Sequence, residues 1–222
     1  MTVMDVVIFG ATGMVGQGVL RECLLDDDVA RVVTVGRSAT GQQHPKLREL
    51  VHGDLFDLAP LAADLSHLDS CFFCLGVSSA GMSEEAYTRI TYDLTLSVAT
   101  FLAERNPRMT FVYVSGAGTD STEQGRSMWA RVKGRTENAL LRLPFRAAYM
   151  FRPGFIQPQH GIRSKTRLYR LVYLVTAPLY PLLRRVMPRL MTTSEQAGRA
   201  MLAVAKHGAP KQLLESDDIN RL

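Results

Sequence analysis

The chain has 222 residues, of which 46% are hydrophobic and 21% are charged, and its formal net charge is +5. This composition excludes a disordered or collagen-like protein, and the length suits one domain with a substantial core. Three cysteines are too few for a disulfide framework, and the N-terminus lacks the basic start of a secretory signal. We therefore expect a single domain over residues 1–222 in a reducing, cytoplasmic compartment.

The N-terminal segment predicts a nucleotide-binding turn. The apolar run 6–9 is typical of a buried strand, a helical pattern covers 13–25, and a second strand-like run follows at 31–36. Glycines at three-residue spacing between strand and helix let backbone N–H groups approach a pyrophosphate at the helix N-terminus. The spacing predicts a dinucleotide cofactor, and the residues expected to hold it here are Gly10, Thr12, Gly13, Met14, Val15 and Gly16.

Strand and helix patterns alternate along most of the chain. Strands are expected at 5–9, 31–36, 48–52, 70–75, 110–115, 147–151 and 212–215, and helices at 13–25, 83–104, 127–141 and 194–207. This alternation predicts an α/β fold, a doubly wound parallel sheet with helices on both faces. Ligands of such sheets bind beyond the carboxyl ends of the strands. The loops that should line that crevice begin at Gly10, Gly36, Leu75, Ser115 and Pro153.

Two cysteines, Cys71 and Cys74, stand three residues apart in an apolar run. Residues at this spacing on a strand point to opposite faces, which favours core packing over a redox or metal-binding pair. No other pattern in the chain has metal-ligand spacing, so we expect no metal.

Residues 160–192 depart from the alternation. No Asp or Glu occurs between Asn138 and Ser194, although ten Arg or Lys residues do. Pro178 and Pro181 interrupt the apolar run 168–183, which is shorter than the roughly 20 residues that span a bilayer as a helix. We expect a small helical lid over the crevice. The alternatives are contact with a membrane surface through 163–190 and a basic face that is simply solvated. We expect no nucleic-acid partner.

The end of the second strand predicts which dinucleotide is bound. NAD-binding proteins usually carry an acidic residue there, but this chain has Arg37. A guanidinium suits a 2′-phosphate in charge and in geometry, which favours NADP(H) over NAD(H); an arginine that merely faces solvent is the alternative. After the third strand, Asp54 and Leu55 are expected beside the adenine, or Asp54 in an exposed turn.

These motifs together resemble those of a known superfamily. The residues that carry the likeness are the glycine turn 10–16, Val35-Gly36-Arg37, Cys74-Leu75-Gly76, Val114-Ser115 and Arg152-Pro153-Gly154. Over residues 3–160 the chain resembles an atypical short-chain dehydrogenase/reductase, near the Tat-interacting oxidoreductase-like proteins and the NAD(P)H-binding epimerase/dehydratase relatives. The resemblance implies a Rossmann fold and adds Leu75, Gly76, Pro153 and Lys133 to the expected cofactor contacts.

The resemblance also implies catalytic positions. In that superfamily a Ser after the fifth strand acts with a Tyr-x-x-x-Lys on the next helix; here Ser115 and Lys133 occupy the Ser and Lys positions, and Trp129 replaces the Tyr. An indole N–H can donate a hydrogen bond but does not release a proton, so cofactor binding is expected while carbonyl reduction needs another acid. Three side chains are candidates for that acid, namely Tyr87, Tyr92 and His160.

The sequence is therefore compatible with two functions. One is an NADPH-dependent oxidoreductase that reduces a small carbonyl-like substrate with Ser115 and Lys133 as polar anchors. The other is a non-catalytic NADP(H)-binding module that senses redox state for a protein partner, which the replacement of the tyrosine by Trp129 favours.

Overall fold

The computed structural model describes residues 3–162 and 191–222. Most of the expected lid (160–192) and all of the expected membrane-contact segment (163–190) lie outside the described residues. The main sheet has seven parallel strands in the order β3-β2-β1-β4-β5-β6-β9, which is the doubly wound arrangement that the sequence predicts. The strands are β1 (Met4–Phe9), β2 (Val29–Gly36), β3 (Leu47–Val51), β4 (Ser70–Phe73), β5 (Thr110–Val114), β6 (Ala147–Arg152) and β9 (Leu213–Glu215).

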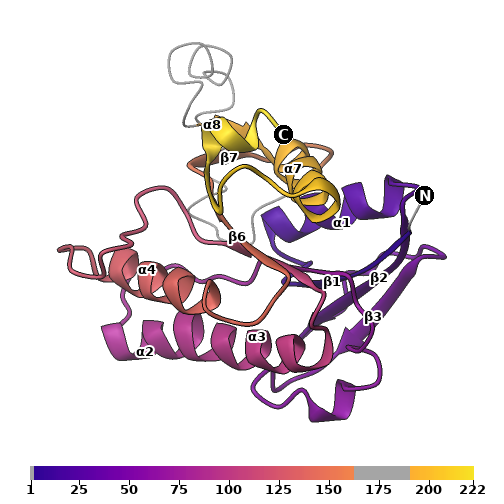
Figure 1. Cartoon of the computed structure of the whole chain (residues 1–222), viewed down its shortest axis with the longest axis horizontal. Helices are drawn as coiled ribbons and strands as arrows, with labels where there is room; N and C mark the ends of the chain where they lie inside the picture. The colour runs from indigo at the N-terminus through magenta and orange to yellow at the C-terminus, as the bar shows by residue number, and fades with distance from the viewer. Residues whose placement is uncertain (1–2, 163–190) are drawn as a thin grey trace.

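Helices cover both faces of this sheet (Figure 1). One face carries α1 (Met14–Leu25) and α7 (Ser194–His207), and the other carries α2 (Glu84–Thr88), α3 (Leu94–Arg105) and α4 (Met128–Leu140). The described ranges also contain a short 3-10 helix (Ala59–Leu61) and the terminal helix α8 (Ser216–Ile219). None of the described helices is long and apolar enough to cross a membrane.

The two helical layers explain why the inner strands are apolar at every position. In β1, Val6 and Ile8 belong to the core under α1 and α7, whereas Val7 and Phe9 belong to the core under α3. A parallel strand with both faces covered reads as a continuous apolar run rather than an alternating one. From β1 the chain adds β2 and β3 on one side of the sheet, and it then adds β4, β5 and β6 on the other side. The strand order therefore reverses at β1, and the crevice of the fold opens at the carboxyl end of this strand.

The cysteine prediction is confirmed by the two cores. Cys71 is buried on the α3 side, and Cys74 packs against the core on the α1 side. All three cysteines are free, and burial raises the pKa of Cys74 to about 12, so this thiol stays protonated at neutral pH.

Two features differ from the expected elements. The single helix expected at 83–104 is divided, because a π-helical turn (Arg89–Asp93) lies between α2 and α3. A second sheet also forms, in which β7 (Phe155–Gln157) pairs in parallel with β8 (Met191–Thr193). Strands of three residues, separated by more than thirty residues of chain, have too little local pattern to be recognised in a sequence.

Candidate functional site

The turn between β1 and α1 is so compact that a side chain would not fit at two of its glycines. Gly10 has a φ of +83°, and a Cβ there would lie 2.9 Å from the Cys74 carbonyl carbon and oxygen. A Cβ at Gly16 would lie 2.2 Å from the Gly10 carbonyl oxygen. The Gly13 N–H donates to that same oxygen at 2.9 Å, which closes the turn. The backbone therefore passes close under the end of β4, as a dinucleotide-binding turn requires.

The N-terminus of α1 is suited to an anion. Gly13 is the N-cap, without a side-chain hydrogen bond, and the first turn contains no acidic residue. The amides of Met14 and Val15 therefore have no intrahelical acceptor, and the positive end of the helix dipole adds to their attraction for a phosphate. These residues fit a dinucleotide pyrophosphate.

A pocket lies beside this turn and joins the ends of several strands. Five of the predicted cofactor residues come together in its wall, namely Gly10, Thr12, Arg37, Leu55 and Leu75. The rest of the lining is Ala11, Thr34, Val35, Gly36, Ser38 and Thr40. We did not expect cofactor contacts from Ala11, Thr34, Ser38 and Thr40. Their position in the turn and around the carboxyl end of β2 is the signal that could have identified them.

Arg37 is exposed at this pocket, and no hydrogen bond or ion pair engages its guanidinium among the described residues. One carboxylate contacts two residues of the pocket wall, Thr34 and Thr40. Glu49 of β3 accepts from the Thr40 amide at 2.6 Å and from the Thr34 hydroxyl at 3.5 Å. Glu49 does not itself line the pocket and serves to tie the 37–40 turn to β3.

The remaining predicted cofactor residues are dispersed. Asp54 is exposed and accepts from the Phe56 amide at 2.9 Å, so it forms a local turn, while the adjacent Leu55 enters the pocket. Gly76 is exposed after β4. Pro153 is buried at the end of β6, where its carbonyl accepts from the Ala117 amide at 2.9 Å. The role of these three residues in cofactor binding stays a prediction.

The structure brings Ser115 and Lys133 together at the carboxyl end of β5. The Lys133 ammonium donates to the Ser115 carbonyl oxygen. The Ser115 side chain is turned into the protein: its hydroxyl lies 2.5 Å from Glu137 Oε1 and 3.1 Å from the Phe151 carbonyl oxygen. Because a hydroxyl has one hydrogen to donate, this serine is already engaged within the protein, and its role toward a substrate carbonyl stays a prediction.

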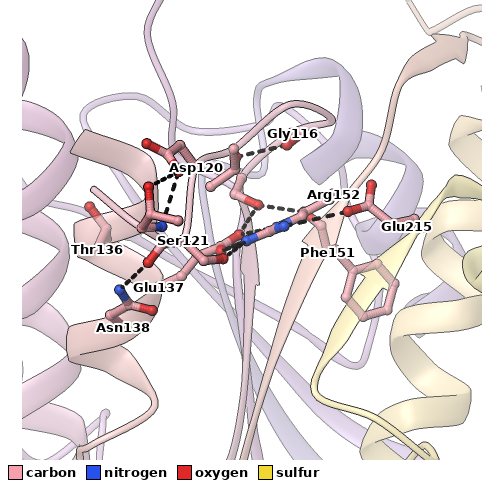
Figure 2. A network of polar contacts seen from close by, with 12 residues as sticks. Gly116, Asp120, Ser121, Thr136, Glu137, Asn138, Phe151, Arg152 and Glu215 are labelled. Atoms are coloured by element: carbon pink, nitrogen blue, oxygen red, sulfur yellow. Dashed lines mark hydrogen bonds and ion pairs between the residues drawn. The ribbon is translucent and has the colours of Figure 1, made fainter. Parts of the chain in front are cut away.

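Glu137, which contacts the Ser115 hydroxyl, forms a buried ion pair with Arg152 (Figure 2). Glu137, one turn beyond Lys133 on α4, is fully buried, and Arg152 at the end of β6 is 9% exposed. The Arg152 Nε lies 3.0 and 3.2 Å from the two Glu137 carboxylate oxygens, and a terminal nitrogen also contacts Glu137. Arg152 further donates to the Ser121 hydroxyl at 2.5 Å and pairs with Glu215 at 3.5 Å. The network joins α4, β6, β9 and the 116–127 loop.

The sequence assigned no role at the site to Glu137 or Arg152, although Arg152 belongs to the Arg152-Pro153-Gly154 motif. The signal in the sequence is that Glu137 follows Lys133 by four residues and so shares its side of α4. Only the structure shows that Arg152 meets it, since the two residues come from different elements.

Trp129 lies one turn before Lys133 on α4 and is half-buried. Its ring covers Gly118 of the loop after β5, where an added Cβ would lie 3.5 Å from the indole. The ring occupies the position of the superfamily's tyrosine and brings no ionisable group to it.

The three substitute acids lie in different surroundings. Tyr87 is buried, and that burial raises the pKa of its phenol. Tyr92 is covered by the Arg135 guanidinium, 4.2 Å from the ring centroid. His160 is bound to Glu195 at 2.6 Å, at the start of the segment that leads away from β7. Among the described residues, no hydrogen bond or ion pair joins any of them to Trp129, Ser115 or Lys133.

The sequence matches the model of the NAD dependent epimerase/dehydratase family over residues 6–127. The chain belongs to this family, which agrees with its resemblance to an atypical short-chain dehydrogenase/reductase.

Among individual relatives, the chain is similar to the protein fmp52-2, mitochondrial, of two fungi. It is 31% identical to the Aspergillus oryzae protein and 29% identical to the Aspergillus terreus protein, each over 97% of this chain and 95% of the relative. These relatives contradict the expectation of a cytoplasmic location, because both carry the word mitochondrial in their names.

Solved structures show the same fold at low sequence identity. The Bordetella bronchiseptica enzyme WbmF in complex with NAD⁺ is 16% identical, with a TM-score of 0.67 over 98% of this chain and 76% of that one. An oxidoreductase of the short-chain dehydrogenase/reductase family from Burkholderia thailandensis is 17% identical, with a TM-score of 0.67 over 99% and 94% of the two chains.

Proposed function

We propose that this protein binds NADP(H) in the pocket at the glycine turn and reduces a small carbonyl-like substrate. The observation that carries the proposal is the pocket itself, in which the turn, the end of β2 and Leu55 meet beside an uncapped helix N-terminus. A dinucleotide extended across this edge would place its pyrophosphate on α1 and its adenosine half toward β2. Family membership and the NAD⁺ complex of WbmF support a nicotinamide dinucleotide.

Arg37 favours the phosphorylated dinucleotide. It lines the pocket, it is exposed, and no carboxylate among the described residues pairs with it. The Glu49 carboxylate nearby is occupied by the Thr40 amide, which reduces its repulsion toward a 2′-phosphate. A charge-assisted contact of this kind contributes about 1.5–3 kcal/mol, or roughly a 10- to 150-fold preference for NADPH.

The experiment compares thermal stabilisation by NADPH and by NADH. We expect NADPH to raise the Tm of the wild-type protein at lower concentrations than NADH does, because a ligand stabilises in proportion to RT ln(1 + [L]/Kd). Arg37→Ala should abolish the difference by weakening NADPH alone. Arg142→Ala, which removes an exposed arginine outside the pocket, is the matched control. Equal stabilisation of the wild type by both dinucleotides would contradict the proposed preference.

The chain's own groups can hold the reacting end of such a cofactor. When bound, the reduced nicotinamide supplies hydride. The Lys133 ammonium, at the carboxyl end of β5, is placed to bind hydroxyl or carbonyl oxygens, and the half-buried Trp129 lies one turn before it on α4. Glu137 and Arg152 fix this end of α4 against β6.

A second function is favoured by one specific observation. Trp129 replaces the residue that releases the proton in the superfamily, which suits a non-catalytic module that binds NADP(H) and reports its redox state to a protein partner. Both functions need the pocket at the glycine turn. They differ in whether NADPH is consumed. A protein that NADPH stabilises, but that oxidises no NADPH when an aldehyde or ketone is added, would favour the module.

A further inference from the structure

Lys133 presents an ammonium group with unused hydrogen-bonding capacity. A lysine ammonium has three hydrogens to donate. Within residues 3–162 and 191–222, the Ser115 carbonyl oxygen is its single hydrogen-bond acceptor. Two N–H groups therefore remain available to a ligand at the carboxyl end of β5, on the edge of the sheet where this fold binds its ligands.

The charge of Lys133 is also without a carboxylate partner. Glu137 lies one turn away on the same helix, yet both of its oxygens are taken by Arg152, and one of them by the Ser115 hydroxyl as well. No ion pair joins Lys133 to any carboxylate in the described part of the chain. Arg152 thus binds the one acid on α4 that could have neutralised the lysine.

Other charged groups around α4 are engaged elsewhere. On the side of α2, Glu84 pairs with Arg131 at 2.6 Å. In the loop before α4, Asp120 accepts from the Gly125 amide at 2.6 Å and from Thr122. On the side of the π-helical turn, Arg135 lies over the Tyr92 ring. Each of these charges is bound locally, which leaves Glu137 as the charge that acts on Lys133.

The surroundings of Lys133 make it a stronger acid than an ordinary lysine. Burial lowers the pKa of Lys133 to about 8, and the negative charge of Glu137 opposes this shift only in part. A group with a pKa near the working pH is both largely protonated and able to give its proton up, which is the condition for an efficient general acid.

Resting on the proposed function, we infer that Lys133 is the proton donor of this protein, in place of the tyrosine that Trp129 has replaced. As an aldehyde or ketone carbon receives hydride from the reduced nicotinamide dinucleotide, one N–H bond of the Lys133 ammonium breaks and an O–H bond forms on the carbonyl oxygen. The products are an alcohol, the oxidised dinucleotide and a neutral lysine amine. The amine then regains a proton from water.

Lys133→Arg tests the inference, because arginine keeps the positive charge and the donors but does not release a proton near neutral pH. With 4-nitrobenzaldehyde and NADPH, we expect reduction to fall at least ~100-fold, the lower end of the effect of a general acid. Stabilisation by NADPH should persist. Lys211→Arg, at an exposed lysine paired with Asp218, is the matched control and should leave both measurements unchanged.

A titration of the protein without cofactor gives a readout independent of turnover. In protein labelled with ¹⁵N,¹³C-lysine, the Lys133 signal is identified among the five lysines by its loss in Lys133→Arg. We expect its pKa near 8, and the rate of reduction should fall as pH rises through the same value.

The outcomes separate the inference from the proposed function. A wild type that NADPH does not stabilise would refute the proposed function. Three results, each with normal stabilisation of the wild type by NADPH, would overturn the inference about Lys133 and leave cofactor binding intact. The first is a Lys133→Arg variant that reduces the aldehyde at the wild-type rate. The others are a wild type that does not reduce the aldehyde and a Lys133 that titrates near 10.5.

Discussion

At the scale of single residues, the site depends on which atoms lie next to a given side chain. Lys133 and Glu137 are four residues apart on one helix, a spacing that commonly gives an ion pair. Here the pair does not form, because Arg152 binds Glu137 from β6. Burial lowers the pKa of Lys133, the charge of Glu137 opposes this shift only in part, and Trp129 has no proton to contribute. The proton donation proposed for Lys133 therefore depends on its burial and on Arg152 holding the one carboxylate of α4.

The glycine turn gives a prediction at the same scale. Gly16→Ala places a methyl group 2.2 Å from the Gly10 carbonyl oxygen, a backbone atom that cannot rotate away. We expect a loss of about 1–3 kcal/mol in the free energy of unfolding, as for other overpacked sites, and weaker stabilisation by NADPH. Urea unfolding measures the first effect and thermal shift the second.

Gly53→Ala is the control for that substitution, because a Cβ there has no heavy atom within 4 Å. It should change the unfolding free energy by less than about 0.5 kcal/mol. If both variants were equally stable, close packing would not be the reason for a glycine at position 16.

At the scale of elements, α1 and α7 pack so closely that their glycines meet. A Cβ at Gly18 would lie 2.4 Å from the Ser194 carbonyl oxygen, and one at Gly198 would lie 2.8 Å from the Glu22 side chain. Residues from distant parts of the sequence thus hold α1 in place, and α1 carries the N-terminus proposed to bind the pyrophosphate. The C-terminal part of the chain is needed to build a site whose motif is N-terminal.

Gly18→Ala should consequently destabilise the protein and weaken NADPH binding, although residue 18 does not line the pocket. The expected loss is about 1–3 kcal/mol. Gly198→Ala should have a similar effect, and the double variant should lose less than the sum, because the first methyl already separates the helices. Urea unfolding of the three variants provides the test. Strict additivity would show that the two glycines do not share one contact.

At the scale of the whole molecule, an ion-pair cluster ties the end of α7 to the turn between α1 and β2. The Lys206 ammonium lies 2.7 Å from Asp26 and 2.6 Å from Asp28. The hydrogen bond from Lys206 lowers the pKa of Asp28. A carboxylate with a lowered pKa stabilises the fold above its unfolded pKa, and this stabilisation is lost as pH falls through the folded value.

Lys206→Gln should therefore lower the Tm at pH 7 by a few degrees. The difference from the wild type should shrink as pH falls below the ordinary aspartate pKa of about 3.9 and Asp28 takes up a proton in the wild type. Thermal unfolding between pH 2 and pH 8 provides the measurement. A difference that stayed constant over this range would mean that Lys206 acts through packing rather than charge.

Much of the fold could be predicted from the sequence because its signals are local. The apolar strands, the glycine spacing and the Thr193 cap of α7, whose hydroxyl accepts from the Gln196 amide at 3.0 Å, each lie within a few neighbouring residues. The π-helical turn and the β7–β8 pair were missed. The first differs from an α-helix by only one extra residue, and the second pairs three-residue strands from distant parts of the chain.

The sequence by itself determined the parallel sheet, the glycine turn, the arginine at the end of β2 and the absence of the usual tyrosine, since each is a matter of residue type at a short spacing. Only the tertiary structure decided that Glu49 stands beside the Arg37 pocket, that Ser115 turns inward and that Arg152 takes Glu137 from Lys133. These contacts join residues on different strands and helices. Their energies depend on distance and burial, which a linear pattern does not contain.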